Sequence, residues 1–186
     1  MIEKKISKFE SKERIEELNP KDTLINAGFK DKMVLCDIGA GTGVFSFPAS
    51  KISTGDIYAI DISDGMIELL RNRVKEHNAK NIVVKKVEKD LLPVESNICD
   101  MAIMVTVLHE VDNKDSMISE IKRILKGYGK FMVIEFHERK TPMGPPVEHR
   151  ISESCVEKLF NDNGFKTISK FLLGENFYSI VFEIEK

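Results

Sequence analysis

The sequence predicts an α/β protein in which a mostly parallel, doubly wound sheet has helices on both faces. Three observations support this fold class. Short apolar runs of strand length alternate with segments whose apolar residues recur at helical spacing, which is the pattern of repeated βαβ units. The run 100–108 is the most continuous apolar stretch, as expected for a central strand covered on both faces. The last two strand-like segments are joined by the tight link 174–176, which permits an antiparallel hairpin.

Helices should fill the intervals between the strands. The first of them, 44–52, contains Pro48, which removes a backbone donor and predicts a bend or an early end. The helix that follows Asn113 should end at Gly127. In the last helix, Cys155 is expected to face the core. The expected strands are 33–38, 57–60, 82–85, 100–108, 130–136, 165–173 and 177–184.

The chain of 186 residues is expected to form a single domain, with a helical cap segment at 1–30 and an α/β core at 31–186. It carries 28 basic and 30 acidic residues, so no excess charge is available to hold a nucleic-acid backbone. Its 3 cysteines are scattered, which indicates neither a disulfide framework nor a zinc site. A charged start and the lack of an apolar run of about 18 residues argue against a signal peptide or a membrane span. A cytoplasmic location is the default expectation.

A glycine-rich stretch, M-V-L-C-D-I-G-A-G-T-G-V-F-S, contains the first expected strand and the turn after it. Gly39, Gly41 and Gly43 supply a turn without side chains, and the N–H groups of the next helix would point into it. Dinucleotide sites that bind a pyrophosphate use G-x-G-x-x-G, but Val44 stands where the third glycine is needed. Asp37 would repel a phosphate and attract a cation. These features favour a nucleoside that bears an amine and a sulfonium.

A second acidic residue, Asp61, ends the second expected strand, about 20 residues after Gly39. A carboxylate at that strand tip can accept hydrogen bonds from both ribose hydroxyls. His109 follows the central apolar run, at the edge where open α/β sheets bind ligands. The sequence therefore predicts carboxylates and a histidine along one edge of the sheet.

Two of these stretches resemble a known family. D-x-G-x-G-x-G, from Asp37 to Gly43, resembles the first motif of the class I S-adenosylmethionine-dependent methyltransferases. L-H-E-V, from Leu108 to Val111, resembles the L-H-H-V of methyltransferases of quinone-biosynthesis and related small-molecule type. The resemblance covers the chain from about residue 30 to the end. It implies a Rossmann-like seven-stranded sheet whose seventh strand inserts beside the fifth, S-adenosylmethionine as the cofactor, and an N-terminal segment lying across that cofactor.

The resemblance also implies which residues bind the cofactor. Residues of the glycine turn would surround its methionine portion, Asp61 its ribose, and residues after the second and third strands its adenine. Thr106 and His109 would lie between cofactor and acceptor, with His109 as the candidate acceptor-site residue and no catalytic residue assigned. The expected cofactor-binding residues are Asp37, Gly39, Ala40, Gly41, Asp61, Ile62, Met66, Glu88, Lys89 and Thr106.

The methyl acceptor is expected to be a small molecule, because the chain has no inserted substrate domain. The stretch 137–150, rich in Pro and Gly, would shape the acceptor entrance, where Glu135, His137, His149 and Arg150 are further candidates. Their spacing fits no helical ligand pair, so no metal is expected. Two alternatives stay open: a cofactor-binding protein without transferase activity that serves as a partner or regulatory subunit, and a nicotinamide-dependent reductase. The sequence leaves the oligomeric state undefined.

Overall fold

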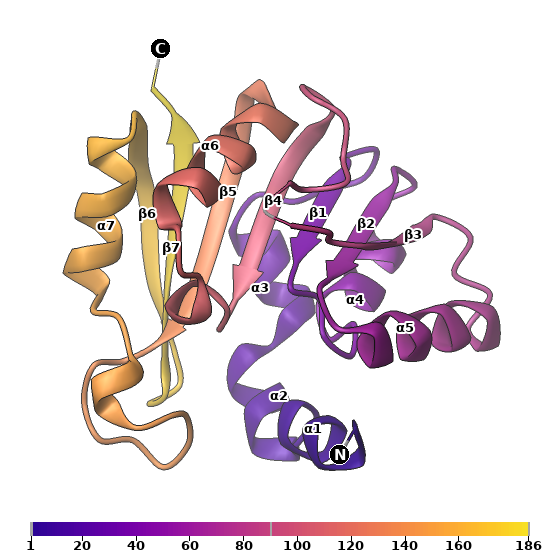
Figure 1. Cartoon of the computed structure of the whole chain (residues 1–186), viewed down its shortest axis with the longest axis horizontal. Helices are drawn as coiled ribbons and strands as arrows, with labels where there is room; N and C mark the ends of the chain where they lie inside the picture. The colour runs from indigo at the N-terminus through magenta and orange to yellow at the C-terminus, as the bar shows by residue number, and fades with distance from the viewer. Residues whose placement is uncertain (1, 90, 186) are drawn as a thin grey trace.

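The computed structural model describes residues 2–89 and 91–185, in which seven strands form one sheet in the order β3-β2-β1-β4-β5-β7-β6. The first five strands run parallel, and β7 pairs antiparallel with both β5 and β6. The predicted doubly wound sheet with an antiparallel C-terminal hairpin is confirmed, and the seventh strand lies beside the fifth (Figure 1). The strands are β1 (Leu35–Ile38), β2 (Ile57–Asp61), β3 (Ile82–Lys86), β4 (Cys99–Val105), β5 (Leu125–Phe136), β6 (Phe165–Leu173) and β7 (Phe177–Ile184).

Helices cover both faces of the sheet, and each layer has its own apolar core. Because the side chains of a strand alternate between faces, Leu35 packs in the cluster with α3, α4 and α5, and Cys36 in the cluster with α6 and α7. None of the helices in the described ranges combines the length and the apolar character that a bilayer crossing needs. The helices are α1 (Ile2–Phe9), α2 (Lys12–Leu18), α3 (Pro20–Asn26), α4 (Ser46–Ile52), α5 (Asp64–Glu76), α6 (Lys114–Ile124) and α7 (Glu153–Asp162).

Two predictions about single helix residues are wrong. The helix α4 begins at Ser46, so Pro48 lies in its first turn, where a backbone N–H has no helical carbonyl to bind. The helix continues past Pro48 to Ile52, so Pro48 does not end it early. Cys155 is exposed, because the core-facing stripe of α7 is formed by Val156 and Phe160 instead.

The predicted end of the helix after Asn113 at Gly127 is also wrong. The helix α6 ends at Ile124, because the next residue, Leu125, already pairs with Cys99 of β4. The register then shifts before Lys130 pairs with Met101, so the residues between form an irregular, partly exposed start of β5. An added Cβ at Gly127 would meet nothing within 4 Å, consistent with a position outside the packed sheet.

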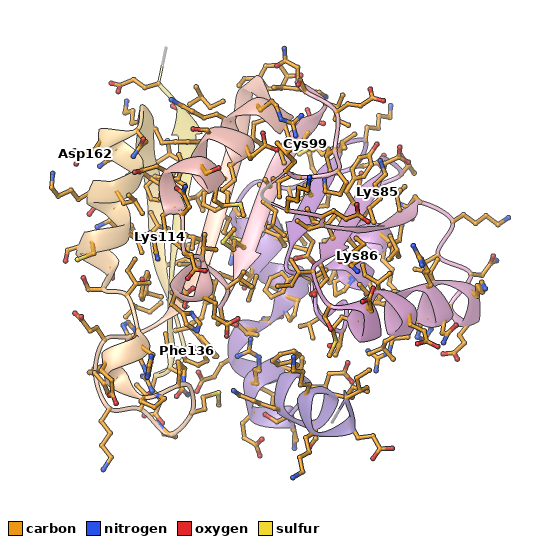
Figure 2. The ribbon with its side chains drawn as sticks, viewed as in Figure 1. Lys85, Lys86, Cys99, Lys114, Phe136 and Asp162 are labelled. Carbon is orange, nitrogen blue, oxygen red and sulfur yellow. The ribbon has the colours of Figure 1, made fainter. Side chains whose placement is uncertain are left out.

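The carboxyl ends of the parallel strands share one edge of the sheet. In Figure 1 the arrowheads of β1, β2 and β4 point toward α1 and α2, which lie below that edge. Figure 2 shows Phe136, the last residue of β5, at the same edge and Cys99, the first residue of β4, at the opposite one. Open α/β sheets bind their ligands at the carboxyl edge, where the order of strands reverses on either side of β1.

Candidate active site

Asp37 lies near the end of β1 and is buried, with 2 % of its surface exposed. Ser46, at the start of α4, donates its hydroxyl to Asp37 Oδ2 at 2.6 Å. Burial is the main cause that raises the pKa of Asp37 to about 7; the charge of Asp61 raises the pKa further, while hydrogen bonds from Ser46 act in the other direction. A cation that binds close to this carboxyl group would therefore favour its deprotonated form.

Asp61 ends β2, and its carboxylate fixes the glycine turn. Oδ2 accepts a hydrogen bond from the N–H of Gly41 at 2.9 Å, and Oδ1 accepts one from the N–H of Ser63 at 2.9 Å. The turn after β1 is thereby attached to the tip of β2. The two carboxylates lie at the tips of β1 and β2, which pair in parallel. They are close enough for the charge of Asp61 to raise the pKa of Asp37.

The glycine turn needs residues without side chains for reasons that the structure makes explicit. The N–H groups of Gly39 and Ala40 both donate to the carbonyl of Ile60, each at 2.9 Å. Gly39 has a φ angle of 74°, and an added Cβ would lie 2.6 Å from Val107 Cγ2. A side chain at this position would meet both backbone strain and a collision.

Thr106 leaves the end of β4 in a strained conformation. Its φ angle is 53°, which is a genuine outlier for a β-branched residue. The N–H of Thr106 donates to the carbonyl of Ile134 at 2.7 Å, and its Oγ1 accepts a hydrogen bond from Arg14 Nη2 at 2.9 Å. The strand β4 thus ends before the predicted limit at Leu108, and the chain turns away in the 3-10 helix η1 (Leu108–Glu110). Strained residues of this kind cluster at active sites.

Arg14 of α2 reaches the same edge from the N-terminal helices. Only 8 % of its surface is exposed, and its Nε has no hydrogen-bond partner in the described part of the chain. The guanidinium carbon lies 5.8 Å from the ring centre of Phe136 and 5.2 Å from that of Phe177. Burial lowers the pKa of Arg14 to about 10, against the opposite influence of the Glu135 charge, so the side chain still carries its charge at neutral pH.

His109, in η1, forms a close pair with Glu135 of β5. Its Nδ1 lies 2.8 Å from Glu135 Oε2, and its backbone N–H donates to Oε1 at 3.1 Å. Because the buried carboxylate only accepts, Nδ1 carries the proton and Nε2 is the free ring nitrogen. Burial by itself would lower the pKa of His109, but the hydrogen bond and charge of Glu135, with a smaller effect of Glu110, raise it.

The residues expected near adenine follow β2 and β3. Ile62 comes directly after Asp61 and exposes 74 % of its surface, so an apolar side chain stands open at the tip of β2. Glu88 and Lys89 are exposed beyond β3, and Lys89 has a φ angle of 58°. Met66, in the first turn of α5, is 2 % exposed and closed off from solvent. The adenine contacts of Ile62, Glu88 and Lys89, and the cofactor contact of Met66, stay predictions.

The helices α1 and α2 are attached across the carboxyl edge at both ends. On one side, Glu10 forms an ion pair with Arg73 of α5. On the other side, Asn176, in the link between β6 and β7, donates from Nδ2 to Glu17 Oε1 at 2.7 Å. Arg14 meets Thr106 between these two attachments. The N-terminal segment therefore covers the strand tips, and its position across the cofactor stays a prediction.

The loop 137–150 is held together mainly by Arg150. Arg150 Nη1 donates to the carbonyls of His137 and Arg139 at 2.9 and 2.8 Å, so this candidate for the acceptor entrance organises the loop backbone instead. His149 is exposed in the 3-10 helix η2 (Val147–His149). Of the candidates around this loop, Glu135 alone is joined to the site, through His109.

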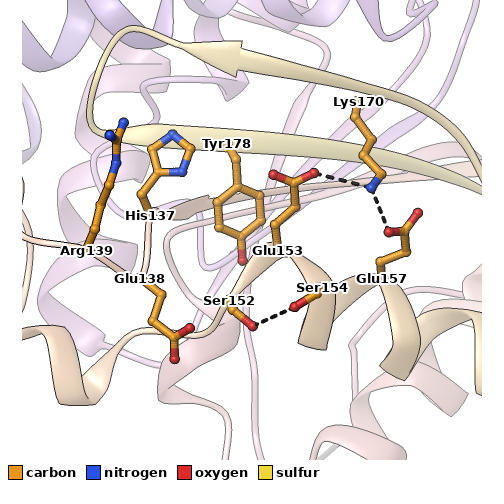
Figure 3. A pocket seen from close by; sticks show the side chains of 9 residues that line it. All are labelled: His137, Glu138, Arg139, Ser152, Glu153, Ser154, Glu157, Lys170 and Tyr178. Carbon is orange, nitrogen blue, oxygen red and sulfur yellow. Dashed lines mark hydrogen bonds and ion pairs between the residues drawn. The ribbon is translucent and has the colours of Figure 1, made fainter.

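A polar hollow of about 430 Å³ lies between the start of this loop, α7 and β6 (Figure 3). Lys170 stands there between Glu153 and Glu157, at 3.3 and 2.6 Å. His137 also lines it, and burial together with the charge of Arg139 lowers the pKa of this histidine. None of the expected cofactor-binding residues lines the hollow. No group of three potential metal ligands comes together within residues 2–89 and 91–185.

A seven-stranded α/β sheet with two carboxylates around a glycine turn is the arrangement of a nucleoside-binding protein, and comparison with known proteins identifies the family. A family model described as "Methyltransferase domain" matches residues 29–181. The chain therefore belongs to the methyltransferase domain family, as a class I S-adenosylmethionine-dependent methyltransferase similar to the quinone-biosynthesis enzymes.

Individual relatives agree with this assignment. The ubiquinone/menaquinone biosynthesis C-methyltransferase UbiE of Shewanella pealeana is 28 % identical over 80 % of this chain and 55 % of its own length. The chain thus spans about half the length of such relatives. A SAM-dependent methyltransferase from Aquifex aeolicus has a TM-score of 0.92, with 27 % identity and 97 % of both chains covered. The [4+2]-cyclase SpnF shares the fold alone, with a TM-score of 0.79, 16 % identity, and 91 % of this chain and 80 % of its own covered.

The family and its structural relatives imply S-adenosylmethionine as the cofactor, and the residues present fit it. Asp61 offers a carboxylate at the tip of β2, Ile62 an exposed apolar side chain beside it, and Asp37 a group able to take a negative charge. A Cβ on Gly39 would collide with the side chain of Val107, so the turn leaves no room for a side chain at this position. Val44 occupies the position where a pyrophosphate-binding turn has its third glycine, which disfavours a dinucleotide in this site.

Two parts of the site were missed by sequence reasoning. Arg14 falls at helical spacing with Phe9, Ile15 and Leu18, and the signal available in the sequence is a charged residue in the apolar stripe of a short helix. The pair formed by Glu17 and Asn176 joins residues 159 positions apart, and no local pattern announces such a contact.

Proposed function

We propose that the chain catalyses the transfer of a methyl group from S-adenosylmethionine to a small-molecule acceptor. The observation that carries this proposal is the pair of carboxylates, Asp37 and Asp61, at the tips of neighbouring strands around a turn without side chains. S-adenosylmethionine, when bound, supplies a methyl group that is already activated for transfer. The chain's own task is to hold the two reactants in line and to keep water away.

Each residue at the first two strand tips has a separate role in this proposal. Asp61 accepts hydrogen bonds from the ribose hydroxyls with the lone pairs that Gly41 and Ser63 leave free. Asp37 supplies negative charge beneath the cationic end of the cofactor. The helices α1 and α2, attached by Glu10 and Glu17, exclude water from the edge.

His109 faces the acceptor in this proposal. Its free Nε2 can accept a proton from an O–H or N–H group of the acceptor, and Glu135 fixes the tautomer that leaves Nε2 free. The carboxylate also stabilises the imidazolium that results. The strain at Thr106 supports this role, because it turns the chain after β4 toward η1 and so positions His109 beside Glu135.

A small acceptor is supported by the elements next to the site and by a relative. Among residues 2–89 and 91–185, the elements that could enclose an acceptor beside the sheet are the short N-terminal helices, η1 and the loop 137–150. The relative from Shewanella pealeana is a C-methyltransferase of ubiquinone and menaquinone biosynthesis, and by analogy we propose a small molecule as the acceptor here.

Radioactive methyl transfer tests the proposal and the alternative of a cofactor-binding protein without turnover. The purified chain is incubated with methyl-labelled S-adenosylmethionine and a cell extract separated into small and large molecules. We expect label in the small-molecule fraction, and its loss with Asp61→Ala. Tight binding of S-adenosylhomocysteine without any label transfer would favour the non-catalytic alternative. A thermal-shift panel with nicotinamide dinucleotides tests the reductase.

A further inference from the structure

Arg14 is a buried cation that the proposed cofactor contacts do not use. The residue is 8 % exposed, and within residues 2–89 and 91–185 the one hydrogen bond that its guanidinium donates goes to the neutral hydroxyl of Thr106. Its Nε is buried without a partner in the same part of the chain, and no carboxylate oxygen there lies within ion-pair distance of the guanidinium. Burying a charge without a charged partner is costly, and such groups are often found where a protein binds a ligand.

The position of Arg14 separates it from the cofactor carboxylates. The sheet order places β2 on one side of β1 and β4, β5 and β7 on the other. Asp61 lies at the tip of β2, whereas Arg14 contacts Thr106 after β4 and lies over Phe136 at the end of β5 and Phe177 at the start of β7. Arg14 therefore lies on the side of the edge where an acceptor would approach.

Glu135 does not neutralise this guanidinium by contact. Its charge acts on Arg14 from a distance, but both of its oxygens are occupied by the side chain and the backbone of His109. When His109 is protonated, the charged groups around Phe136 and η1 are the cations Arg14, Arg150 and His109 and the anions Glu135 and Glu110, so positive charge is in excess. An added anion would find a complementary field there.

We propose that Arg14 binds a carboxylate of the methyl acceptor, so that the acceptor is an apolar or aromatic acid; this inference rests on the proposed function. A guanidinium binds a carboxylate through two parallel N–H donors, and Arg14 has donors to spare beyond the one that Thr106 accepts. The rings of Phe136 and Phe177 beside the guanidinium suit an apolar body next to the acid group.

In this proposal the carboxylate bound by Arg14 does not contain the atom that receives the methyl group. Transfer of a methyl group to an anionic atom would form the new bond with an electron pair of that atom and remove its negative charge, while the bond from the methyl carbon to the sulfonium sulfur breaks and its electron pair stays on sulfur, leaving S-adenosylhomocysteine. A guanidinium that contacted this atom would stabilise the starting state more than the transition state and so slow the reaction. Held on a carboxylate elsewhere in the acceptor, the same contact orients the substrate without that penalty.

Binding measurements test the proposal without requiring catalytic activity. They use the chain saturated with S-adenosylhomocysteine. Benzoate and its neutral analogue benzamide are titrated calorimetrically into the chain saturated with S-adenosylhomocysteine. The variants are Arg14→Met, Arg14→Lys, and Arg139→Met as a matched control in an exposed arginine of the loop 137–150. We expect benzoate to bind the unmodified chain and Arg139→Met at least about tenfold more tightly than benzamide, Arg14→Met to lose this preference, and Arg14→Lys to keep part of it.

A second pair of ligands decides whether Arg14 belongs to the cofactor instead. S-adenosylhomocysteine carries an amino-acid carboxylate that 5′-methylthioadenosine lacks. We expect Arg14→Met to change the affinity for both by less than about twofold. A selective loss of S-adenosylhomocysteine binding, equal binding of benzoate and benzamide, no benzoate binding, or a preference that survives in Arg14→Met would each overturn the inference. If the unmodified chain fails to bind S-adenosylhomocysteine, the proposed function fails, and the benzoate comparison is then made on the ligand-free chain.

Discussion

The two halves of the carboxyl edge differ in charge and in how they are built. The half at β1 and β2 is acidic, with Asp37 and Asp61 on a turn formed by residues close in sequence. The half at β4, β5 and β7 is held together by contacts between distant segments, such as Arg14 with Thr106 and His109 with Glu135. The half at β1 and β2 is therefore a local motif, formed by one strand, one turn and the next strand. The half at β4, β5 and β7 depends on contacts specific to this sequence and on the N-terminal segment.

The largest expected effect is at the acidic half. Asp61→Ala removes a charged hydrogen-bond acceptor, worth about 1.5–3 kcal/mol, and should weaken S-adenosylhomocysteine binding about tenfold or more in calorimetry. It also releases the N–H groups of Gly41 and Ser63. Asp56→Ala, at the other end of β2, is exposed and serves as the control. Unchanged affinity in Asp61→Ala would remove the acidic half from the cofactor site.

The second prediction concerns the pH dependence of that half. The pKa of Asp37 is raised to about 7, so the carboxyl group is mostly protonated at pH 6 and charged at pH 8. A cationic ligand binds the charged form, so affinity for S-adenosylmethionine should rise with pH, by up to about tenfold per unit below pH 7, and level off above it. Calorimetry in buffers of different ionisation enthalpy should detect one proton released at pH 6.

The variant Asp37→Asn separates charge from shape at the same position. Its cofactor affinity should be low and independent of pH between 6 and 8. A carboxyl group with a raised folded pKa favours folding while it is protonated, and this contribution is lost as pH rises from about 4 through 7. Asp37→Asn should therefore be more stable than the unmodified chain at pH 8, by chemical denaturation. A pH-dependent affinity in this variant would assign the titration to another group.

Much of the acidic half could be predicted from sequence because its parts are local. The spacing of Asp37, the glycines and Asp61 follows from one strand, one turn and the next strand, and the structure joins Asp61 to Gly41 directly. The parallel βαβ series and the terminal hairpin followed in the same way from the apolar runs, whereas the place of the seventh strand beside the fifth was implied by the family resemblance. The errors at Pro48 and Gly127 arose where helix position or strand register, set by packing, overrode a local signal.

The other half could be predicted only in part. His109 was found because it follows a central strand, but its partner Glu135 was one of several candidates until the distance between β4 and β5 was fixed by their pairing. Arg14 contacts Thr106 across 92 positions of sequence. Such contacts depend on how α2 docks on the sheet. Helical spacing predicts which face of α2 is buried, but it does not predict which strand or loop that face contacts.

The third prediction tests the pairing of His109 with Glu135 in the absence of any ligand. Glu135→Gln keeps the shape but removes the charge that raises the pKa of His109, while burial, which lowers it, remains. The pKa should fall in an NMR titration of the imidazole nitrogens, because the charge and hydrogen bond that raise it are weakened. Glu110→Gln is the control, because Glu110 Oε1 is 3.8 Å from Nε2 and its side chain is 76 % exposed. Equal shifts in both variants would contradict the pairing.

The smallest expected effect is at the attachment of α1 and α2 to the acidic half. Arg73 pairs with Glu10 and donates to the carbonyl of Thr42 at 2.8 Å, so Arg73→Met should loosen this side of the N-terminal segment. The pair is partly exposed, so the loss should be no more than about 1 kcal/mol, seen as roughly fivefold faster amide hydrogen exchange in residues 12–18. Arg71→Met, on the exposed side of α5, should leave exchange there unchanged. If residues 12–18 exchange at the same rate in both variants, the N-terminal segment is held mainly by the hydrogen bond between Glu17 and Asn176. The half of the edge at β4, β5 and β7 would then anchor α1 and α2 over both halves.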